Sequence, residues 1–359
     1  MYMNNSKKWC ICSLALALAL MVFAGTLTAV IDPFFHYHAP LNGLQYPLNN
    51  QRYQNDGIVK NFPYDALITG TSMTENFKTS EFDALFGVNS IKVSFSGGTY
   101  EEINSNLQRA IEANPELKIV IYGLDEWFLF AGKSMILADG EYPTYLYDNN
   151  PFNDVEYLLN KDVLCNNTVE VLNYTRSGQT TTSFDAFGSW DGSFPYDAAN
   201  VISNYTRAAK VSENFIFTEE LQTRLSDTIL NTAVKLAREN PEIQFIYFFP
   251  PYSILNWDNH NQSGTLQRQI EAFTLASQLL LEADNIALYS FYNDYGTITN
   301  LNLYRDTVHY SGEINSLILQ RIHNGEYKLT KENYSAYWQE ILDFYQSYDY
   351  DAIFQTETA

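Results

Sequence analysis

The chain has 359 residues, of which 46% are hydrophobic and 18% charged, so it is long and apolar enough to fold around a substantial core. A formal net charge of −21 argues against nucleic acid as a partner and disfavours close contact between the globular part and an anionic membrane surface. The three cysteines, Cys10, Cys12 and Cys165, offer neither a disulfide framework nor zinc-type spacing, and we expect neither a metal nor a cofactor.

The chain begins with an apolar stretch that predicts a membrane anchor. Residues 9–31 carry no charged side chain and would extend roughly 34 Å as a helix, enough to cross a bilayer core. Lys7 and Lys8 precede the stretch and Asp32 follows it, which places the N-terminus in the cytoplasm and the rest of the chain outside a single-pass membrane anchor, residues 1–31. A cleaved signal peptide is the alternative, but the apolar run is long for one.

Residues 32–60 form a predicted juxtamembrane segment that is rich in aromatic side chains. Phe34, Phe35 and Tyr37 alternate with His36 and His38, a pattern typical of the interfacial belt beside a membrane span. A metal site is the alternative for the two histidines, although no further Cys or His cluster completes it.

Residues 61–359 are expected to form one α/β domain. Strand-like runs cover residues 65–69, 91–95, 118–122, 243–249 and 286–289. Helix-like runs cover residues 100–113, 219–239, 265–282, 313–322 and 331–346. This alternation predicts about five parallel strands with helices on both faces, a three-layer sandwich, followed by a tail that is frayed from Tyr348.

A serine follows the first predicted strand at once. Gly70-Thr71-Ser72 reads as a tight turn between the strand and a helix, which would lift the Ser72 hydroxyl above the sheet edge at the positive end of that helix. Such a placement suits a nucleophile. The alternative is a plain helix cap, and the motif alone is weak.

A long polar and aromatic stretch, residues 128–217, interrupts the alternation. A structureless loop of this length is improbable, so we expect an inserted cap over the site. Its aromatic residues among Asp and Asn suit sugar rings, and the alternative is that most of them form the small core of the cap. These residues are Tyr142, Tyr145, Tyr147, Phe152, Tyr157, Trp190, Phe194, Tyr196 and Tyr205.

Asp306 and His309 lie three residues apart, just before a predicted helix. A serine nucleophile needs a base, and the base needs a carboxylate that orients it. His309, one of only five histidines, therefore lies close enough to Asp306 to act as a base that this carboxylate orients. The alternative is a surface Asp–His pair.

Together these blocks resemble the SGNH (GDSL-like) hydrolase superfamily in order and sheet position over residues 60–325. The matching blocks are Gly70-Thr71-Ser72, Ser96-Gly97-Gly98-Thr99, Gly123-Leu124-Asp125 and Asp306 to His309. The resemblance implies a flavodoxin-like fold with Ser72, His309 and Asp306 as catalytic residues. It also implies an oxyanion hole formed by the backbone N–H groups of Ser72 and Gly97 and by the side chain at position 125.

Two residues depart from the family pattern. Thr71 replaces the usual Asp before the nucleophile, which many relatives tolerate. Asp125 replaces an Asn, and an ionised carboxylate cannot donate a hydrogen bond to an oxyanion. Either Asp125 is protonated, or another group donates, or the third donor is missing.

The anchored architecture is similar to that of the lipoteichoic-acid D-alanylation and alginate O-acetylation proteins, which work beside membrane-bound O-acyltransferases. This similarity implies an extracytoplasmic ester hydrolase or O-acyltransferase that acts on a cell-envelope polysaccharide, with a membrane-bound O-acyltransferase as a partner. Two alternatives stay open. One is a non-catalytic glycan-binding or assembly protein with a degenerate SGNH fold, and the other is a phospholipase-like lipid esterase. The lipid esterase predicts an apolar pocket, where the glycan enzyme predicts a polar, aromatic one.

Overall fold

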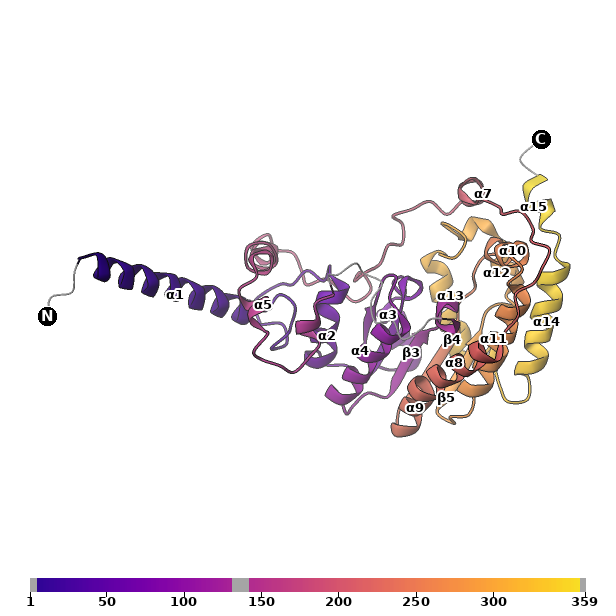
Figure 1. Ribbon diagram of the computed structural model, residues 1–359, viewed down its shortest axis with the longest axis horizontal. Helices are drawn as coiled ribbons and strands as arrows, with labels where there is room; N and C mark the ends of the chain where they lie inside the picture. Colours follow the sequence, from indigo (N-terminus) through magenta and orange to yellow (C-terminus); the bar gives the residue numbers. More distant parts are fainter. Residues whose placement is uncertain (1–4, 131–141, 356–359) are drawn as a thin grey trace. The chain divides into compact units, whose positions relative to one another are not determined.

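The computed structural model describes residues 5–130 and 142–355, which divide into two compact units (Figure 1). The first unit comprises residues 5–63 and 142–183, and the second comprises residues 64–130 and 184–355. The predicted insertion, residues 128–217, therefore does not form one unit. Its residues 142–183 belong to the first unit, residues 128–130 and 184–217 belong to the second, and residues 131–141 lie outside the described residues.

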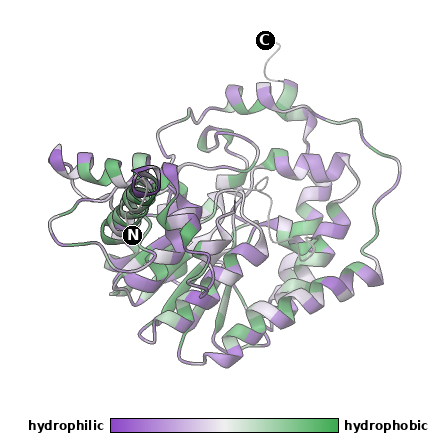
Figure 2. Ribbon diagram, turned by 60° about the vertical axis from the view of Figure 1, so that its left-hand side comes forward, coloured by the Kyte–Doolittle hydropathy of each residue, from purple (hydrophilic) through white to green (hydrophobic). Residues whose placement is uncertain are grey.

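The first unit begins with helix α1, Asn5–Ile31, which is long and apolar enough to span a membrane. Its residues are mainly hydrophobic (Figure 2), and only Thr28 and Ile31 near its C-terminal end are buried. An apolar helix that leaves most of its surface uncovered in the folded chain is typical of a membrane segment. A signal sequence near the N-terminus has the same properties.

The rest of the first unit packs around a small aromatic core. Its short helices are α2 (Gln51–Asn61), η3 (Thr144–Leu146), α5 (Val155–Leu158), η4 (Val163–Thr168) and α6 (Val169–Arg176). Phe34 and Tyr157 are buried in this core, and Phe35 is fully buried nearby, so the prediction that these two Phe side chains belong to an interfacial belt is wrong. The buried Asp32 carboxylate accepts hydrogen bonds from the N–H groups of residues 36–38 and from the Tyr157 hydroxyl, which holds the segment after α1 in place.

A six-stranded sheet forms the centre of the second unit, in the order β2-β1-β3-β4-β5-β6. Its strands are β1 (Ala66–Gly70), β2 (Ser90–Ser94), β3 (Ile119–Gly123), β4 (Gln244–Phe249), β5 (Ile286–Ser290) and β6 (Lys328–Leu329). The first five are parallel and β6 is antiparallel. Strands β1, β2 and β5 are buried at every position, as expected of a parallel sheet covered on both faces. The prediction of an α/β fold with a mostly parallel sheet is confirmed.

Helices connect and cover the strands of the second unit. The longer ones are α3 (Thr79–Phe86), α4 (Tyr100–Ala113), α8 (Glu219–Ile229), α10 (Ile254–Gln262), α11 (Leu266–Leu280), α13 (Gly312–His323) and α14 (Tyr334–Ser347). The shorter ones are η1 (Ser72–Thr74), η2 (Glu126–Leu129), α7 (Ala198–Asn204), η5 (Leu230–Val234), α9 (Lys235–Glu239), α12 (Tyr295–Ile298), η6 (Leu301–Leu303) and α15 (Asp351–Gln355). Helix α3 packs against α13, and α11 packs against both α8 and α14.

The C-terminal end of the chain is more ordered than its sequence suggests. Tyr350 is buried, and Asp351 at the start of α15 pairs with Arg207 at 2.5 Å. The prediction that the chain is frayed from Tyr348 is therefore wrong as far as Gln355, and residues 356–359 lie outside the described residues.

Candidate active site

Ser72 lies in a tight turn at the carboxyl end of β1. Gly70 has a φ of +148°, and a Cβ atom there would lie 2.6 Å from the Thr74 side chain, so only glycine fits. The Thr71 hydroxyl caps the short helix η1, which begins at Ser72. The predicted helix after Ser72 is thus a three-residue 3₁₀ turn, and α3 starts only at Thr79. In this turn the N–H groups of Met73 and Thr74 donate to the hydroxyl and the carbonyl of Thr71, and a turn this short carries little helix dipole.

Asp306 and His309 lie in a loop between η6 and α13. Tyr304 and Tyr310 pair as an antiparallel bridge at the base of this loop, and the Arg305 N–H donates to the His309 carbonyl at 2.9 Å. The segment after β4 supports the tip, because the hydroxyl and the N–H of Ser253 both donate to the Thr307 carbonyl. This loop, residues 304–310, carries the proposed general base His309, and we call it the base loop. It is therefore held at the carboxyl end of the sheet.

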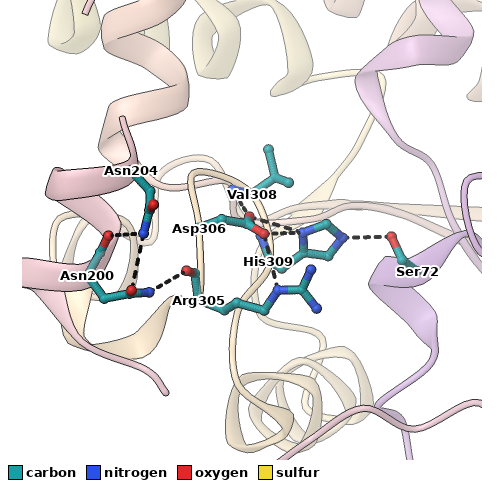
Figure 3. A network of polar contacts seen from close by, with 7 residues as sticks. All are labelled: Ser72, Asn200, Asn204, Arg305, Asp306, Val308 and His309. Carbon is teal, nitrogen blue, oxygen red and sulfur yellow. Dashed lines mark hydrogen bonds and ion pairs between the residues drawn. The ribbon is translucent and has the colours of Figure 1, made fainter. Parts of the chain in front are cut away.

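The loop brings the His309 ring between Ser72 and Asp306 (Figure 3). Ser72 Oγ lies 2.8 Å from His309 Nε2, although the two residues are 237 positions apart in sequence. On the other side of the ring, His309 Nδ1 lies 2.8 Å and 3.0 Å from the two carboxylate oxygens of Asp306. The three predicted residues thus form a hydroxyl–imidazole–carboxylate chain with the geometry of a serine-hydrolase triad.

The Asp306 carboxylate is held in its charged form. One of its oxygens accepts the N–H groups of Val308 and His309 at 2.9 and 2.8 Å, and Arg305 Nε lies 3.3 Å from the other. Burial acts to raise the pKa of Asp306, but these backbone hydrogen bonds and the adjacent His309 ring lower it to about 2. Asp306 is therefore a permanent acceptor for the ring N–H. The Arg305 carbonyl in turn accepts the side-chain amide of Asn200 at 3.2 Å (Figure 3).

Aromatic side chains of the predicted insertion pack on this triad. The Trp190 ring stands perpendicular to the His309 ring at a centroid distance of 5.5 Å. The Arg305 guanidinium lies over both Trp190 and Phe194, with its central carbon 5.0 and 4.0 Å from their ring centroids. Trp190 therefore restricts the tilt of the imidazole, and Arg305 links this aromatic pair to Asp306.

Residues 184–197, which we call the bridging segment, are tied to both halves of the site. Asn76, just after the nucleophile turn, accepts hydrogen bonds from the hydroxyl of Ser189 and the N–H groups of Trp190 and Asp191. The Asp191 carboxylate accepts the N–H of Gly312 at the start of α13. The bridging segment thus connects the chain beside Ser72 to the chain beside His309.

A buried lysine supports the same region from within the sheet. Lys92 in β2 is fully buried, and its ammonium donates to the carbonyl groups of Glu75, Phe77 and Asp185. Burial lowers the pKa of Lys92 to about 7. The lysine therefore joins the chain that follows Ser72 to the first residues of the bridging segment.

The predicted oxyanion-hole residues lie around Ser72. Ser72, Gly97 and Asp125 all line one pocket together with His309. Gly97 has a φ of +59°, a conformation that favours glycine, and follows the carboxyl end of β2. The start of η1 and the loop at Gly97 therefore line the same cavity as the nucleophile.

Asp125 is buried, and its oxygens are already in use. The Thr71 hydroxyl donates to one carboxylate oxygen and the Tyr252 hydroxyl donates to the other. Burial raises the pKa of Asp125 to about 6, in spite of these two hydrogen bonds. At neutral pH the group is mainly ionised and accepts two hydroxyls, so it supplies no hydrogen for an oxyanion.

The pocket beside Ser72 has a volume of about 540 Å³ and is lined mainly by carbon atoms. Its wall includes aliphatic and aromatic side chains from η1, the start of α4, the carboxyl end of β3, η2, the segment after β4 and the loop before α13. These are Met73, Tyr100, Ile103, Tyr122, Leu124, Trp127, Phe128, Tyr252 and Val308. Trp127 is 70% exposed at this pocket. The size is that of a small-molecule site.

The two histidines considered as metal ligands, His36 and His38, have different partners. His36 Nε2 lies 3.4 Å from an Asp154 oxygen, and the His38 ring contacts the carbonyl groups of Ala29 and Ala39. Within residues 5–130 and 142–355, no group of three or more His, Cys, Asp or Glu side chains is arranged to hold a metal ion.

Tyr252 and Asn76 were missed at the site from the sequence, and Trp190 was named only as one aromatic residue of the cap, without its contact with His309. Tyr252 follows β4 by three residues, and the rule that ligands bind at carboxyl ends of parallel strands was a signal for it. Trp190 and Asn76 meet only through the tertiary fold, so no local pattern identifies them. No protein-family model matches the chain, and no curated protein sequence is significantly similar to it.

Proposed function

We propose that the protein is a serine ester hydrolase or O-acyltransferase. The observation that carries this proposal is the chain from Ser72 through His309 to Asp306 at a pocket. Triads of this kind recur on unrelated folds and perform acyl transfer in each.

In the proposed reaction, Ser72 Oγ attacks the ester carbonyl while His309 Nε2 accepts the hydroxyl proton. Asp306 stabilises the imidazolium that forms and fixes its orientation. The N–H groups of Ser72 and Gly97 stabilise the tetrahedral oxyanion. The C–O bond to the leaving alcohol then breaks, His309 returns the proton to that alcohol, and an acyl-serine remains. Water or a sugar hydroxyl attacks the acyl-serine by the same steps in reverse.

The SGNH superfamily is the family to which we assign this chemistry. The strand order β2-β1-β3-β4-β5 is that of flavodoxin-like sheets, and the three early sequence blocks follow β1, β2 and β3. Helix pairs α3–α13 and α8–α11 are consistent with a three-layer sandwich.

A substrate outside the cytoplasm follows from the proposed topology. With α1 as a single-pass anchor and Lys7 and Lys8 inside, the second unit works at the outer surface of the membrane. An envelope polysaccharide, supplied with acyl groups by a membrane-bound O-acyltransferase partner, is our first choice. The apolar wall of the pocket favours a lipid ester as a second candidate.

A fluorophosphonate probe tests the proposal, because it phosphonylates only an activated serine. We expect labelling of the full chain in detergent at Ser72, loss of labelling in Ser72→Ala, and a decrease of at least a hundredfold in rate in His309→Ala. Ser96→Ala, which alters another hydroxyl in a predicted block, is the matched control and should label normally. A wild-type chain that fails to label at Ser72 would favour the non-catalytic alternative.

A further inference from the structure

The pocket at Ser72 offers an apolar interior because most polar side chains in its wall already have partners. The hydroxyls of Thr71 and Tyr252 donate to Asp125, and the Tyr100 hydroxyl pairs with Thr232 at 2.9 Å. The Thr99 hydroxyl caps α4 by accepting a hydrogen bond from the Glu102 N–H at 3.1 Å. A ligand inside the pocket therefore meets mainly carbon, and a polar sugar ring there would lose hydrogen bonds to water without replacement.

The position of the pocket assigns it to the acyl side of an ester. Most of its lining comes from the ends of β1 and β3, the Gly97 loop, α4 and η2, and only Val308 and His309 come from the base loop. The leaving alcohol must lie next to His309 Nε2, which returns the proton to it. The bulk of the pocket is therefore available to the acyl group that becomes attached to Ser72.

The size of the pocket decides which acyl group fits. At roughly 30 Å³ per heavy atom, an acetyl group would fill about 90 Å³ and leave most of the 540 Å³ empty. A chain of roughly eight carbons would fill about half of the same space. Each buried methylene would strengthen binding by up to about fourfold.

We propose that this pocket binds an aliphatic acyl group much larger than acetyl, of roughly six or more carbons, so that the substrates are esters of such acids. This inference rests on the proposed function, since it assumes that Ser72 forms an acyl-enzyme. It names an acyl group larger than acetyl and leaves the alcohol on the His309 side, outside the apolar part of the pocket.

Ile103 provides the test, because it is buried on α4 and lines the pocket. The assay measures kcat/KM of the full chain in detergent for p-nitrophenyl esters from acetyl to dodecanoyl. For the wild type, we expect kcat/KM to be at least tenfold higher for esters with six to ten carbons in the acyl group than for the acetyl ester. Ile103→Phe should lower kcat/KM for the octanoyl ester by at least tenfold and change that for acetyl by less than threefold. Ile103→Ala should move the optimum to longer chains.

Leu107→Phe is the matched control. Leu107 is equally buried one turn further along α4 and is not part of the described pocket wall, so overpacking there should leave the chain-length profile unchanged. If Ile103→Phe does not fold, the shift in Ile103→Ala decides the case. A wild type that prefers acetyl, or equal profiles for both Phe variants, would overturn the acyl-pocket assignment alone. A wild type that cleaves no ester and does not react at Ser72 would remove the proposed function and this inference with it.

Discussion

At the scale of single residues, Asp125 departs most from the pattern expected of an oxyanion hole. Its carboxylate is buried between two hydroxyl donors, so Thr71 and Tyr252 satisfy it without any contribution to the reaction. In the proposed reaction only backbone N–H groups would then stabilise the oxyanion, which is chemically sufficient in many acyl-transfer enzymes. The residue is better described as a buried acid that holds the turn before Ser72 to the segment after β4.

The raised pKa of Asp125 predicts a pH-dependent contribution to stability. Between its unfolded value of 3.8 and its folded value of about 6, the folded state binds more protons than the unfolded state. The free energy of unfolding of the wild type, relative to Asp125→Asn, should therefore fall as the pH rises from 4 to 6, by about 3 kcal/mol in total. Urea unfolding of the full chain in detergent, followed by tryptophan fluorescence at several pH values, measures this difference.

Asp306→Asn serves as the control, because the stability contribution of Asp306 should change with pH in the opposite direction. The pKa of Asp306 is lowered to about 2, so its stabilising contribution is complete above pH 4 and is lost as the pH falls toward 2. A relative stability of Asp125→Asn that does not change between pH 4 and 6 would show that Asp125 has no raised pKa.

The sequence identified the three residues of the hydroxyl–imidazole–carboxylate chain but not the residues that hold them. Ser72, Asp306 and His309 follow or precede recognisable elements, and their types restrict the chemistry that each can do. Trp190 lies in a stretch without periodicity, and its contact with His309 depends on how a long connection folds back. Such long-range packing leaves no local signal, so sequence reasoning gave only a general role to the aromatic residues of residues 128–217.

At the scale of elements, the strands were predictable because buried parallel strands are short apolar runs. The five predicted strands differ from β1 to β5 by no more than one residue at either end. Strand β6 has only two residues, too few to show alternation, and was missed. The helix expected after Ser72 is only a 3₁₀ turn. Its Met73 carbonyl accepts a hydrogen bond from the Asn315 side-chain amide in α13 and not from an N–H group of a continuing helix.

The bridging segment predicts a measurable coupling between stability and activity. Asn76→Ala would remove the acceptor of three hydrogen bonds in a buried position. We expect the free energy of unfolding to decrease by about 2–4 kcal/mol, because N–H groups of the bridging segment lose their partner. The rate of fluorophosphonate labelling at Ser72 should also fall, since Trp190 would no longer hold the His309 ring.

Asn76→Asp is the matched variant, because a carboxylate oxygen can accept the same three hydrogen bonds. It should retain a labelling rate closer to that of the wild type than Asn76→Ala does. Equal losses in the two variants would mean that the accepting oxygen is not what couples the bridging segment to the site.

At the scale of the whole molecule, the question is on which side of a membrane the folded units lie. Cys165 is free and exposed in the first unit, whereas Cys10 and Cys12 lie within α1. We expect a membrane-impermeant maleimide to label Cys165 on intact cells and the chain to stay in the membrane after carbonate extraction. The reason is the proposed topology, in which α1 spans the bilayer with Lys7 and Lys8 inside.

Cys165→Ser is the control and should abolish this labelling without changing membrane retention. A chain recovered in the soluble fraction without its first residues would instead indicate a cleaved signal sequence. Labelling that requires broken cells would place both units in the cytoplasm and contradict the proposed topology.

The separation of 237 residues between hydroxyl and imidazole has a consequence for biosynthesis. At translation rates of about 5–20 residues per second, the ribosome makes the nucleophile about 10–50 s before the base. If Ser72 is the proposed nucleophile, a nascent polypeptide therefore carries an inert serine during its synthesis, and the serine becomes reactive only when the last third of the chain has been made and has folded. The time at which Ser72 begins to react with the fluorophosphonate probe would accordingly report when folding of the second unit is complete.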